Sequence, residues 1–248
     1  LLGASGALPA IPFQIASTLI SLAIIPLCLT RSSAPAPQDA TAFSIRSLFA
    51  ASPLGVVGAV ATGLMLGAFY GLAAVHVRRL GLNLGATASF MMTVILGGVA
   101  MQWPLGRLSD RYDRRAVIVW SFAATLAVSI ALSMLSRGGL PLLVLGAAFG
   151  GLSFALYPLC VAHSNDRLLA SERVAASGRL VLLYSVGAAL GPMGAAAMMT
   201  LAGAGGLFLF IALCAGATLG FGLWRQLSSD PVPAPEQQDF QIVPRTTP

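Results

Sequence analysis

The sequence predicts an all-α membrane protein with seven transmembrane helices. Hydrophobic residues make up 57% of the 248 positions and charged residues only 9%, whereas a soluble domain carries about 25% charged residues. The mean hydropathy is +0.86. A water-soluble fold could not cover its surface with so few charges, so the lipid bilayer is the expected surrounding of this chain.

Seven apolar stretches have the length of a membrane span, which takes roughly 20 residues. None of them contains Asp, Glu, Lys or Arg, and they cover residues 7–29, 53–77, 84–105, 116–135, 140–162, 180–201 and 205–224. Residues 31–52 form a polar linker with the string SAPAP, which is too rich in Pro and Ser to span. Residues 228–248 hold five prolines and little apolar content, which predicts a disordered tail.

The arginines predict which side of the membrane each connection faces. Lysine is absent, so all 14 basic residues are arginines. When the connections are assigned to alternate sides, eleven arginines fall on one side and only Arg78, Arg79 and Arg137 on the other. Because cytoplasmic loops carry the excess of Lys and Arg, the linker, the connection after the third span and the C-terminus are expected to be cytoplasmic.

The connection between the third and fourth spans reads GRLSDRYDRR, and six of its ten residues are charged. A solvated loop that follows the positive-inside rule would explain the arginines. It would not explain the interleaved Asp110 and Asp113, nor Gly106, which we expect to let the third span end abruptly.

This run resembles the conserved loop of the major facilitator superfamily, G-x-L-A-D-R-x-G-R-R/K-x-x-L. Ser109 stands for the small residue, Ile118 for the final leucine, and Asp113 departs from the pattern where the family usually has glycine. The matching positions are Gly106, Leu108, Asp110, Arg111, Arg114 and Arg115.

The resemblance implies a division of the chain. In the family this loop joins spans 2 and 3, and a weaker copy joins spans 8 and 9, which fits one span followed by a linker and six more spans. Residues 1–30 would be the last helix of the N-terminal half and 31–52 the central cytoplasmic linker. Residues 53–227 would form the C-terminal six-helix half and 228–248 a cytoplasmic tail. The strings QWPLGRLSDRYDRR, LYPLCVAHSND and GRLVLLYSVGAALGPMGA are similar to the YcaD-like bacterial branch, which implies a bacterial inner membrane.

The resemblance also implies a function. Members of the family are secondary transporters of small solutes that rock one six-helix half against the other. The charged loop would latch the cytoplasmic gate, with Asp110 accepting hydrogen bonds from Arg111 or Arg114 and facing a helix N-terminus of the N-terminal half. That half and a small-molecule substrate are therefore the expected partners.

Polar side chains on the spans that line the family's cavity are candidates for the substrate path. They are Tyr70, Thr93, Tyr157 and Tyr184. A buried Tyr can instead present its ring to the core and its hydroxyl to a neighbour. His163 and Asp166 form either a proton-handling cluster or, with Asn165, a helix cap or turn. Gly191 and Pro192 predict a bend in the sixth span.

Two other classes of function compete with transport. A seven-helix receptor or sensor is the alternative, although the charged loop and the long linker after one span count against it, and the missing lysine excludes a retinal Schiff base. A membrane enzyme would need clusters of His, Asp or Ser within the spans, so no enzyme is expected. The cysteines lie singly in apolar runs, so no metal or cofactor is expected. The arginines lie in short connections, so no nucleic-acid binding is expected.

Overall fold

The structure, a computed structural model, describes residues 11–29 and 44–228, and within them every regular element is a helix. Helix α1 belongs to one compact unit, and α2 to α8 form another. The elements are α1 (Ile11–Leu29), α2 (Ile45–Ala51), α3 (Pro53–Arg79), α4 (Leu84–Arg111), α5 (Arg114–Met134), α6 (Leu140–Asn165), α7 (Arg173–Ala202), a 3₁₀ turn (Gly203–Gly205) and α8 (Gly206–Ser228).

The helices have the length and apolar composition of membrane spans. Five described stretches qualify by these two criteria. The last of them, Arg173–Arg225, contains α7, the 3₁₀ turn and α8 as far as Arg225. The apolar part of α1, Phe13–Pro26, is shorter. Each of the seven expected spans thus corresponds to a helix, and the predicted all-α membrane class is confirmed.

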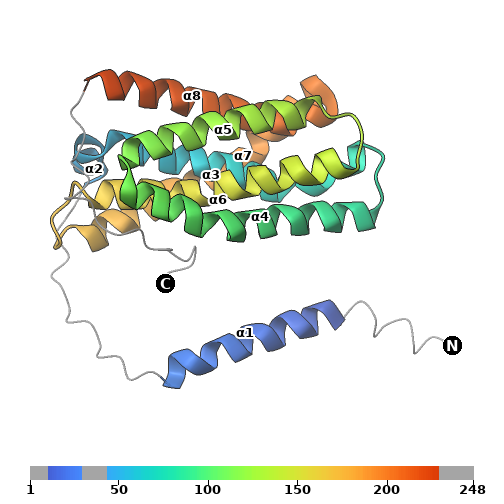
Figure 1. Ribbon diagram of the computed structural model, residues 1–248, viewed down its shortest axis with the longest axis horizontal. Helices are drawn as coiled ribbons and strands as arrows, with labels where there is room; N and C mark the ends of the chain where they lie inside the picture. Colours follow the sequence, from blue (N-terminus) through green and yellow to red (C-terminus); the bar gives the residue numbers. More distant parts are fainter. Residues whose placement is uncertain (1–10, 30–43, 229–248) are drawn as a thin grey trace. The chain divides into compact units, whose positions relative to one another are not determined.

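Helices α3 to α8 run side by side as a bundle with roughly parallel axes (Figure 1). The most extensive pairings are α3 with α7, α4 with α6 and α5 with α8, and α6 also packs against α5 and α3. In Figure 1, α5 and α8 lie along one face of the bundle, α4 lies along the opposite face, and α6 lies between α5 and α4.

Glycines allow α3 and α7 to approach closely. A Cβ atom added to Gly63 would meet the carbonyl oxygen of Tyr184, and one added to Gly67 would meet that of Ala188. From the other side, a Cβ on Gly191 would meet the carbonyl oxygen of Leu64. In lipid, where apolar side chains gain little by leaving the solvent, such close backbone packing is a main source of helix association.

Glycines also allow α4 and α6 to pack closely. A Cβ on Gly97 would meet the carbonyl oxygen of Ala147, and one on Gly150 would meet that of Val94. Small residues spaced four apart in the sequence indicate such contacts, but the spacing alone does not decide them. Gly220, which has the same spacing from Gly216, has no heavy atom of a neighbour within 4 Å of the position its Cβ would take.

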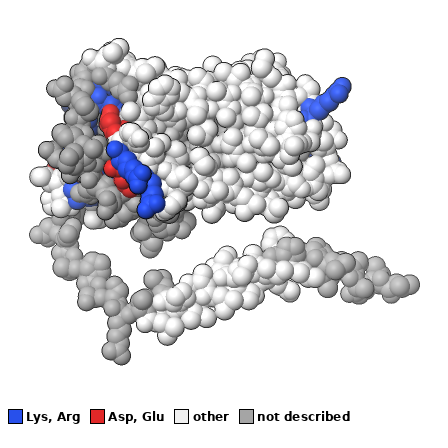
Figure 2. Space-filling view, in the orientation of Figure 1, with Lys and Arg blue, Asp and Glu red and all other residues white. Residues whose placement is uncertain are grey.

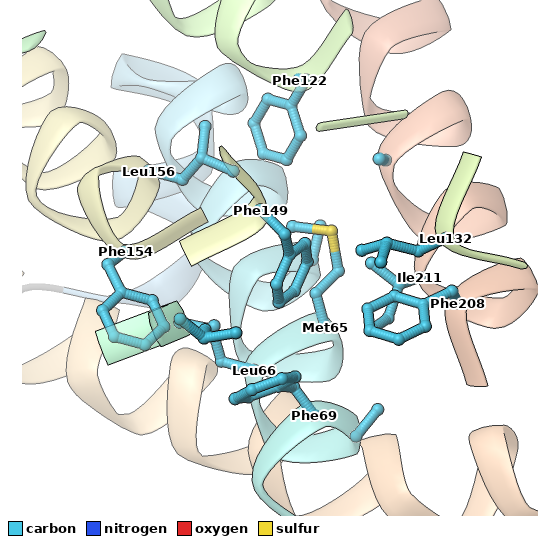
Figure 3. Close-up of a cluster of buried hydrophobic side chains, with 14 of the residues drawn as sticks. Met65, Leu66, Phe69, Phe122, Leu132, Phe149, Phe154, Leu156, Phe208 and Ile211 are labelled. Carbon is cyan, nitrogen blue, oxygen red and sulfur yellow. The ribbon is translucent and has the colours of Figure 1, made fainter. Parts of the chain in front are cut away.

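Aromatic rings fill the centre of the bundle (Figure 3). Phe149 on α6 lies between Phe69 on α3 and Phe208 on α8, with ring centroids 5.3 Å and 5.5 Å away. All three side chains are fully buried. Large apolar side chains also cover the outer surface; Trp120, for example, is 74% exposed. A bundle that is apolar both inside and outside is suited to a bilayer.

Charged side chains gather at one end of the bundle, and a smaller positive group lies at the other end (Figure 2). The surface between the two ends is uncharged in this view. This distribution agrees with the sequence, in which the charged residues described lie in the connections and in the first or last two turns of the helices.

The structure corrects two predicted boundaries. Helix α4 continues to Arg111, so Gly106 lies inside the helix and does not end it. The apolar run stops at residue 105, but a helix needs apolar residues only where it crosses lipid, and its backbone hydrogen bonds continue beyond. The expected linker contains helix α2, whose N-cap Ser44 accepts a hydrogen bond from the backbone N–H of Ser47. The rest of the linker and the predicted disordered tail beyond Ser228 lie outside the described residues.

Candidate gating site

The charged run folds as the end of one helix and the start of the next. Helix α4 ends at Arg111 and α5 begins at Arg114, so only Tyr112 and Asp113 connect them. Asp113 is the N-cap of α5, and its carboxylate accepts a hydrogen bond of 3.1 Å from the backbone N–H of Arg115. A carboxylate at a helix N-terminus satisfies free N–H groups and is stabilised by the helix dipole.

Arg114 is the centre of the site. Its Nη1 donates to both carboxylate oxygens of Asp166, at 2.7 Å and 2.6 Å. Its Nη2 donates to Oδ1 of Asp110 at 3.0 Å. Of the two partners predicted for Asp110, Arg111 and Arg114, the structure shows Arg114.

The two ion pairs of Arg114 differ in burial. The side chains of Arg114 and Asp166 are 1% and 2% exposed, whereas that of Asp110 is 28% exposed. A charge taken out of water needs a partner with good geometry, which Asp166 supplies to Arg114. Asp110 can reach solvent or another protein surface while its partner is already held.

The helix ends explain why the buried pair is needed. Arg114 is the first residue of α5, where the helix dipole disfavours a positive charge, and Asp166 is the C-cap of α6, where it disfavours a negative charge. Each charge lies at the unfavourable end of its own helix. The ion pair offsets both effects at once and joins α5 to α6 at this end of the bundle.

Further arginines surround the pair. Arg115 is 4% exposed. Burial lowers the pKa of Arg167 below its ordinary value, nearby Arg115 and Arg225 lower it further, and Asp113 and Asp166 oppose the shift. These groups therefore form one electrostatic cluster, which holds an excess of positive charge.

The end of α6 is also tied to the start of α3. The hydroxyl of Ser164 donates to Oγ of Ser52 at 3.1 Å and to the carbonyl oxygen of Cys160 at 2.9 Å. Both serines are fully buried. Helices α3, α5 and α6 are thus joined by polar contacts within a few residues of Arg114, so the site rests on three elements of the bundle.

Of the proposed proton-handling pair, Asp166 serves as the partner of Arg114. His163 lies in the last turn of α6, is 5% exposed, and has Arg114, Arg115 and Arg167 near it. The structure brings both residues to the charged end of the bundle. A role in moving protons remains a prediction.

The candidate substrate-path residues do not form one cluster. Tyr157 on α6 and Tyr184 on α7 are in ring contact, with centroids 4.7 Å apart. Tyr70 on α3 is 46% exposed, and its ring centroid lies 6.0 Å from that of Phe154. The hydroxyl of Thr93 donates to the carbonyl oxygen of Ser89 one turn earlier in α4.

The expected bend at Gly191 and Pro192 falls inside α7, whose helix is assigned without interruption from Arg173 to Ala202. Gly191 contributes to the close packing on α3, and the Pro192 ring faces Gly71, with Cγ 3.1 Å from the position of an added Cβ. At these two positions the structure shows close packing of α7 on α3. The bend remains a prediction.

Three contacts were not foreseen from the sequence. The Arg114–Asp166 pair joins residues 52 positions apart. At the other end of the bundle, Arg79 donates to the carbonyl oxygen of Met199 at 2.9 Å, and Nδ1 of the buried His76 lies 2.7 Å from the carbonyl oxygen of Ala204. An Arg near a helix C-terminus that binds its last carbonyls is a common cap, but the pairing of such distant residues has no local signal.

Within residues 11–29 and 44–228, no group of three or more His, Cys, Asp or Glu side chains could hold a metal ion. The charged end presents ion pairs and hydrogen bonds, which can hold surfaces together and release them.

Comparison with known proteins finds relatives that cover most of the chain. The uncharacterized MFS-type transporter YcaD of Escherichia fergusonii is 31% identical over 198 residues, which cover 79% of this chain and 51% of that protein. The YcaD of Salmonella heidelberg is 31% identical over 196 residues, covering 78% and 50%. The chain spans about half the length of these curated relatives. Residues 55–246 match the sequence model of the Major Facilitator Superfamily, and the chain therefore belongs to this family.

Proposed function

We propose that the chain is the C-terminal half of a secondary active transporter of small solutes that works by alternating access. Residues 53–227 would form the six-helix half, 1–30 the last helix of the N-terminal half and 31–52 the cytoplasmic linker. Two findings support this division: helices α3 to α8 form one bundle, and the chain spans about half of its curated relatives. In such carriers a second half rocks against the first around a central site.

The observation that carries the proposal is the cluster around Arg114, at the position of the family's charged loop. Asp166 would hold Arg114 permanently, because both side chains are buried. Asp110 would be the switching partner, because it is 28% exposed and can face the N-terminal half. An exposed ion pair contributes about 0–1 kcal/mol, so a contact of this strength can be broken in every transport cycle.

The charge distribution supports a cytoplasmic location for this end. Only three described arginines, Arg78, Arg79 and Arg137, lie in the opposite connections. Nine described arginines lie at the charged end, namely Arg46, Arg107, Arg111, Arg114, Arg115, Arg167, Arg173, Arg179 and Arg225. By the positive-inside rule the charged end and the C-terminus would be cytoplasmic, in the inner membrane of a bacterium.

The Tyr157–Tyr184 pair is the best candidate for a contact with substrate on this half. Tyr157 is largely buried, and both hydroxyls belong to helices that line the cavity in the family's arrangement. Beyond the two turns nearest each end, α3 to α8 carry no Asp, Glu, Lys or Arg. The contribution of this half to a substrate site would therefore come from aromatic rings, hydroxyls and apolar side chains.

The test is uptake by proteoliposomes. The full-length protein would be screened against a panel of labelled solutes, and the 248-residue chain would be reconstituted alongside it at equal amounts. We expect saturable uptake of at least one solute by the full-length protein and none by this chain alone, because the cavity forms between two halves. Saturable uptake by the chain alone would refute the proposed division.

A further inference from the structure

We propose that a groove between α4, α5 and α6 binds one anionic phospholipid, with an acyl chain in the groove and the phosphate at Arg111. The groove has a volume of about 450 Å³ and is open on one side. This volume is within the range of small-molecule sites. Its lining is almost entirely apolar and includes Leu105, Leu108, Tyr112, Val117, Trp120 and Leu152. The inference does not depend on transport activity.

The groove begins at the charged turn and continues toward the middle of the bundle. Leu105 and Leu108 share one face of α4, because they are three residues apart, and Tyr112 is the C-cap that follows the helix. Trp120 lies six residues into α5, about 9 Å along the helix axis. Tyr112 and Trp120 are 62% and 74% exposed. Exposed Tyr and Trp side chains are typical of the headgroup level of a bilayer, with the acyl chains just below.

The phosphate position follows from the free arginine at the mouth of the groove. Arg111 directly precedes Tyr112, is exposed, and has a side chain that forms no hydrogen bond or ion pair with any described residue. The guanidinium group of Arg107, one turn earlier, lies 4.4 Å from the ring centroid of Trp103. A guanidinium group binds phosphate in a bidentate manner.

The charge balance favours an anionic lipid over a zwitterionic one. Nine arginines but only four acidic residues, Asp110, Asp113, Asp166 and Glu172, lie at this end among the described residues. Asp110 and Asp166 are paired with Arg114, and Asp113 caps α5, so each of these carboxylates already has a partner while the arginines remain in excess. A net negative headgroup would therefore gain more than a neutral one.

Quenching of Trp120 fluorescence by lipids brominated on their acyl chains tests the proposal. The chain has three tryptophans, so Trp103→Phe combined with Trp224→Phe leaves Trp120 as the only reporter. In phosphatidylcholine vesicles, we expect brominated phosphatidylglycerol to reach half-maximal quenching at about a fivefold lower mole fraction than brominated phosphatidylcholine. This corresponds to about 1 kcal/mol for one arginine beside an anionic headgroup.

Matched variants separate this site from a general attraction to anionic lipid. Arg111→Gln should bring the ratio of the two mole fractions to about one. Arg111→Lys keeps the positive charge and should keep the preference for the anionic lipid. Arg137→Gln, at the other end of the bundle, should also keep it. A ratio near one in the unchanged chain, or a preference that survives Arg111→Gln, would overturn the proposal. Absence of quenching by both lipids would also overturn it, since a protein segment would then fill the groove.

Discussion

Arg114 at the start of α5 and Asp166 at the end of α6 form an ion pair of 2.6 Å in which both side chains are almost completely buried. The pair joins two helix ends whose dipoles each oppose the charge they carry. Removing Arg114 takes from the buried Asp166 its ion-pair partner. Removing Asp166 leaves the buried Arg114 with Asp110, which is 28% exposed and compensates the charge less well.

Asp166→Asn should destabilise the bundle strongly. Removing one partner of a buried ion pair costs about 3–5 kcal/mol in soluble proteins, because the remaining charge stays buried. Asp110→Asn removes a partner that is 28% exposed and leaves the Arg114–Asp166 pair intact, so it should cost less than about 1 kcal/mol. Thermal unfolding of the chain in detergent measures both variants. Equal losses for the two would contradict the assignment of Asp166 as the permanent partner.

Asp113 should act through its cap on α5 and not through its charge. Asp113→Asn keeps an oxygen that can accept from the N–H of Arg115, so its stability should remain within about 0.5 kcal/mol of the parent. Asp113→Ala removes the cap and should cost about 1 kcal/mol. The comparison is made by the same unfolding measurement. A large loss in the Asn variant would show that the negative charge itself matters.

Gly67→Ala should weaken the packing of α3 on α7, because the added Cβ would meet the carbonyl oxygen of Ala188. Overpacking of this kind costs typically about 1–3 kcal/mol. Gly220→Ala is the matched control, since nothing lies within 4 Å of its Cβ position, and it should cause no loss. Melting temperatures of the two variants in detergent should therefore differ clearly. If both variants melted like the parent, the close α3–α7 contact would be wrong.

Labelling with a membrane-impermeant thiol reagent in intact cells should distinguish the two ends of the bundle. In a chain without its native cysteines, Arg137→Cys should be labelled and Arg111→Cys should not, because the positive-inside rule assigns residue 111 to the cytoplasm. Arg111→Cys should react after the cells are opened. Labelling of residue 111 but not residue 137 in intact cells would reverse the topology.

Much of the fold was predictable from the sequence because lipid imposes simple demands. A span must be apolar and about 20 residues long, so the helices could be located from composition alone. Their ends could not be, since α4 continues through Arg111 in a region where polar residues are tolerated. Glycines spaced four apart, such as Gly63 and Gly67, lie where α3 packs closely on α7, but the spacing does not say which helix they meet, and at Gly216 and Gly220 it marks no comparably close approach.

The candidate site was only partly predictable. The motif drew attention to Asp110 and Arg114, which are four residues apart across one short turn. Asp166 was noticed as a polar residue at a helix end, but nothing local in the sequence connects it to Arg114. That pairing depends on how α5 and α6 pack, and the packing is decided by small residues and apolar shape along the whole length of both helices.

The most direct test of the proposed gate is the transport rate per inserted molecule of full-length protein carrying Asp110→Asn. The substitution removes the charge that we propose to grip the N-terminal half, a contact of about 0.3–1 kcal/mol if it is made to a helix N-terminus. Turnover should fall about two- to fivefold, while folding and insertion stay normal and Asp113→Asn has little effect. If Asp110→Asn transports like the parent and Asp113→Asn is the crippling change, the charged turn is a solvated loop and not a gate.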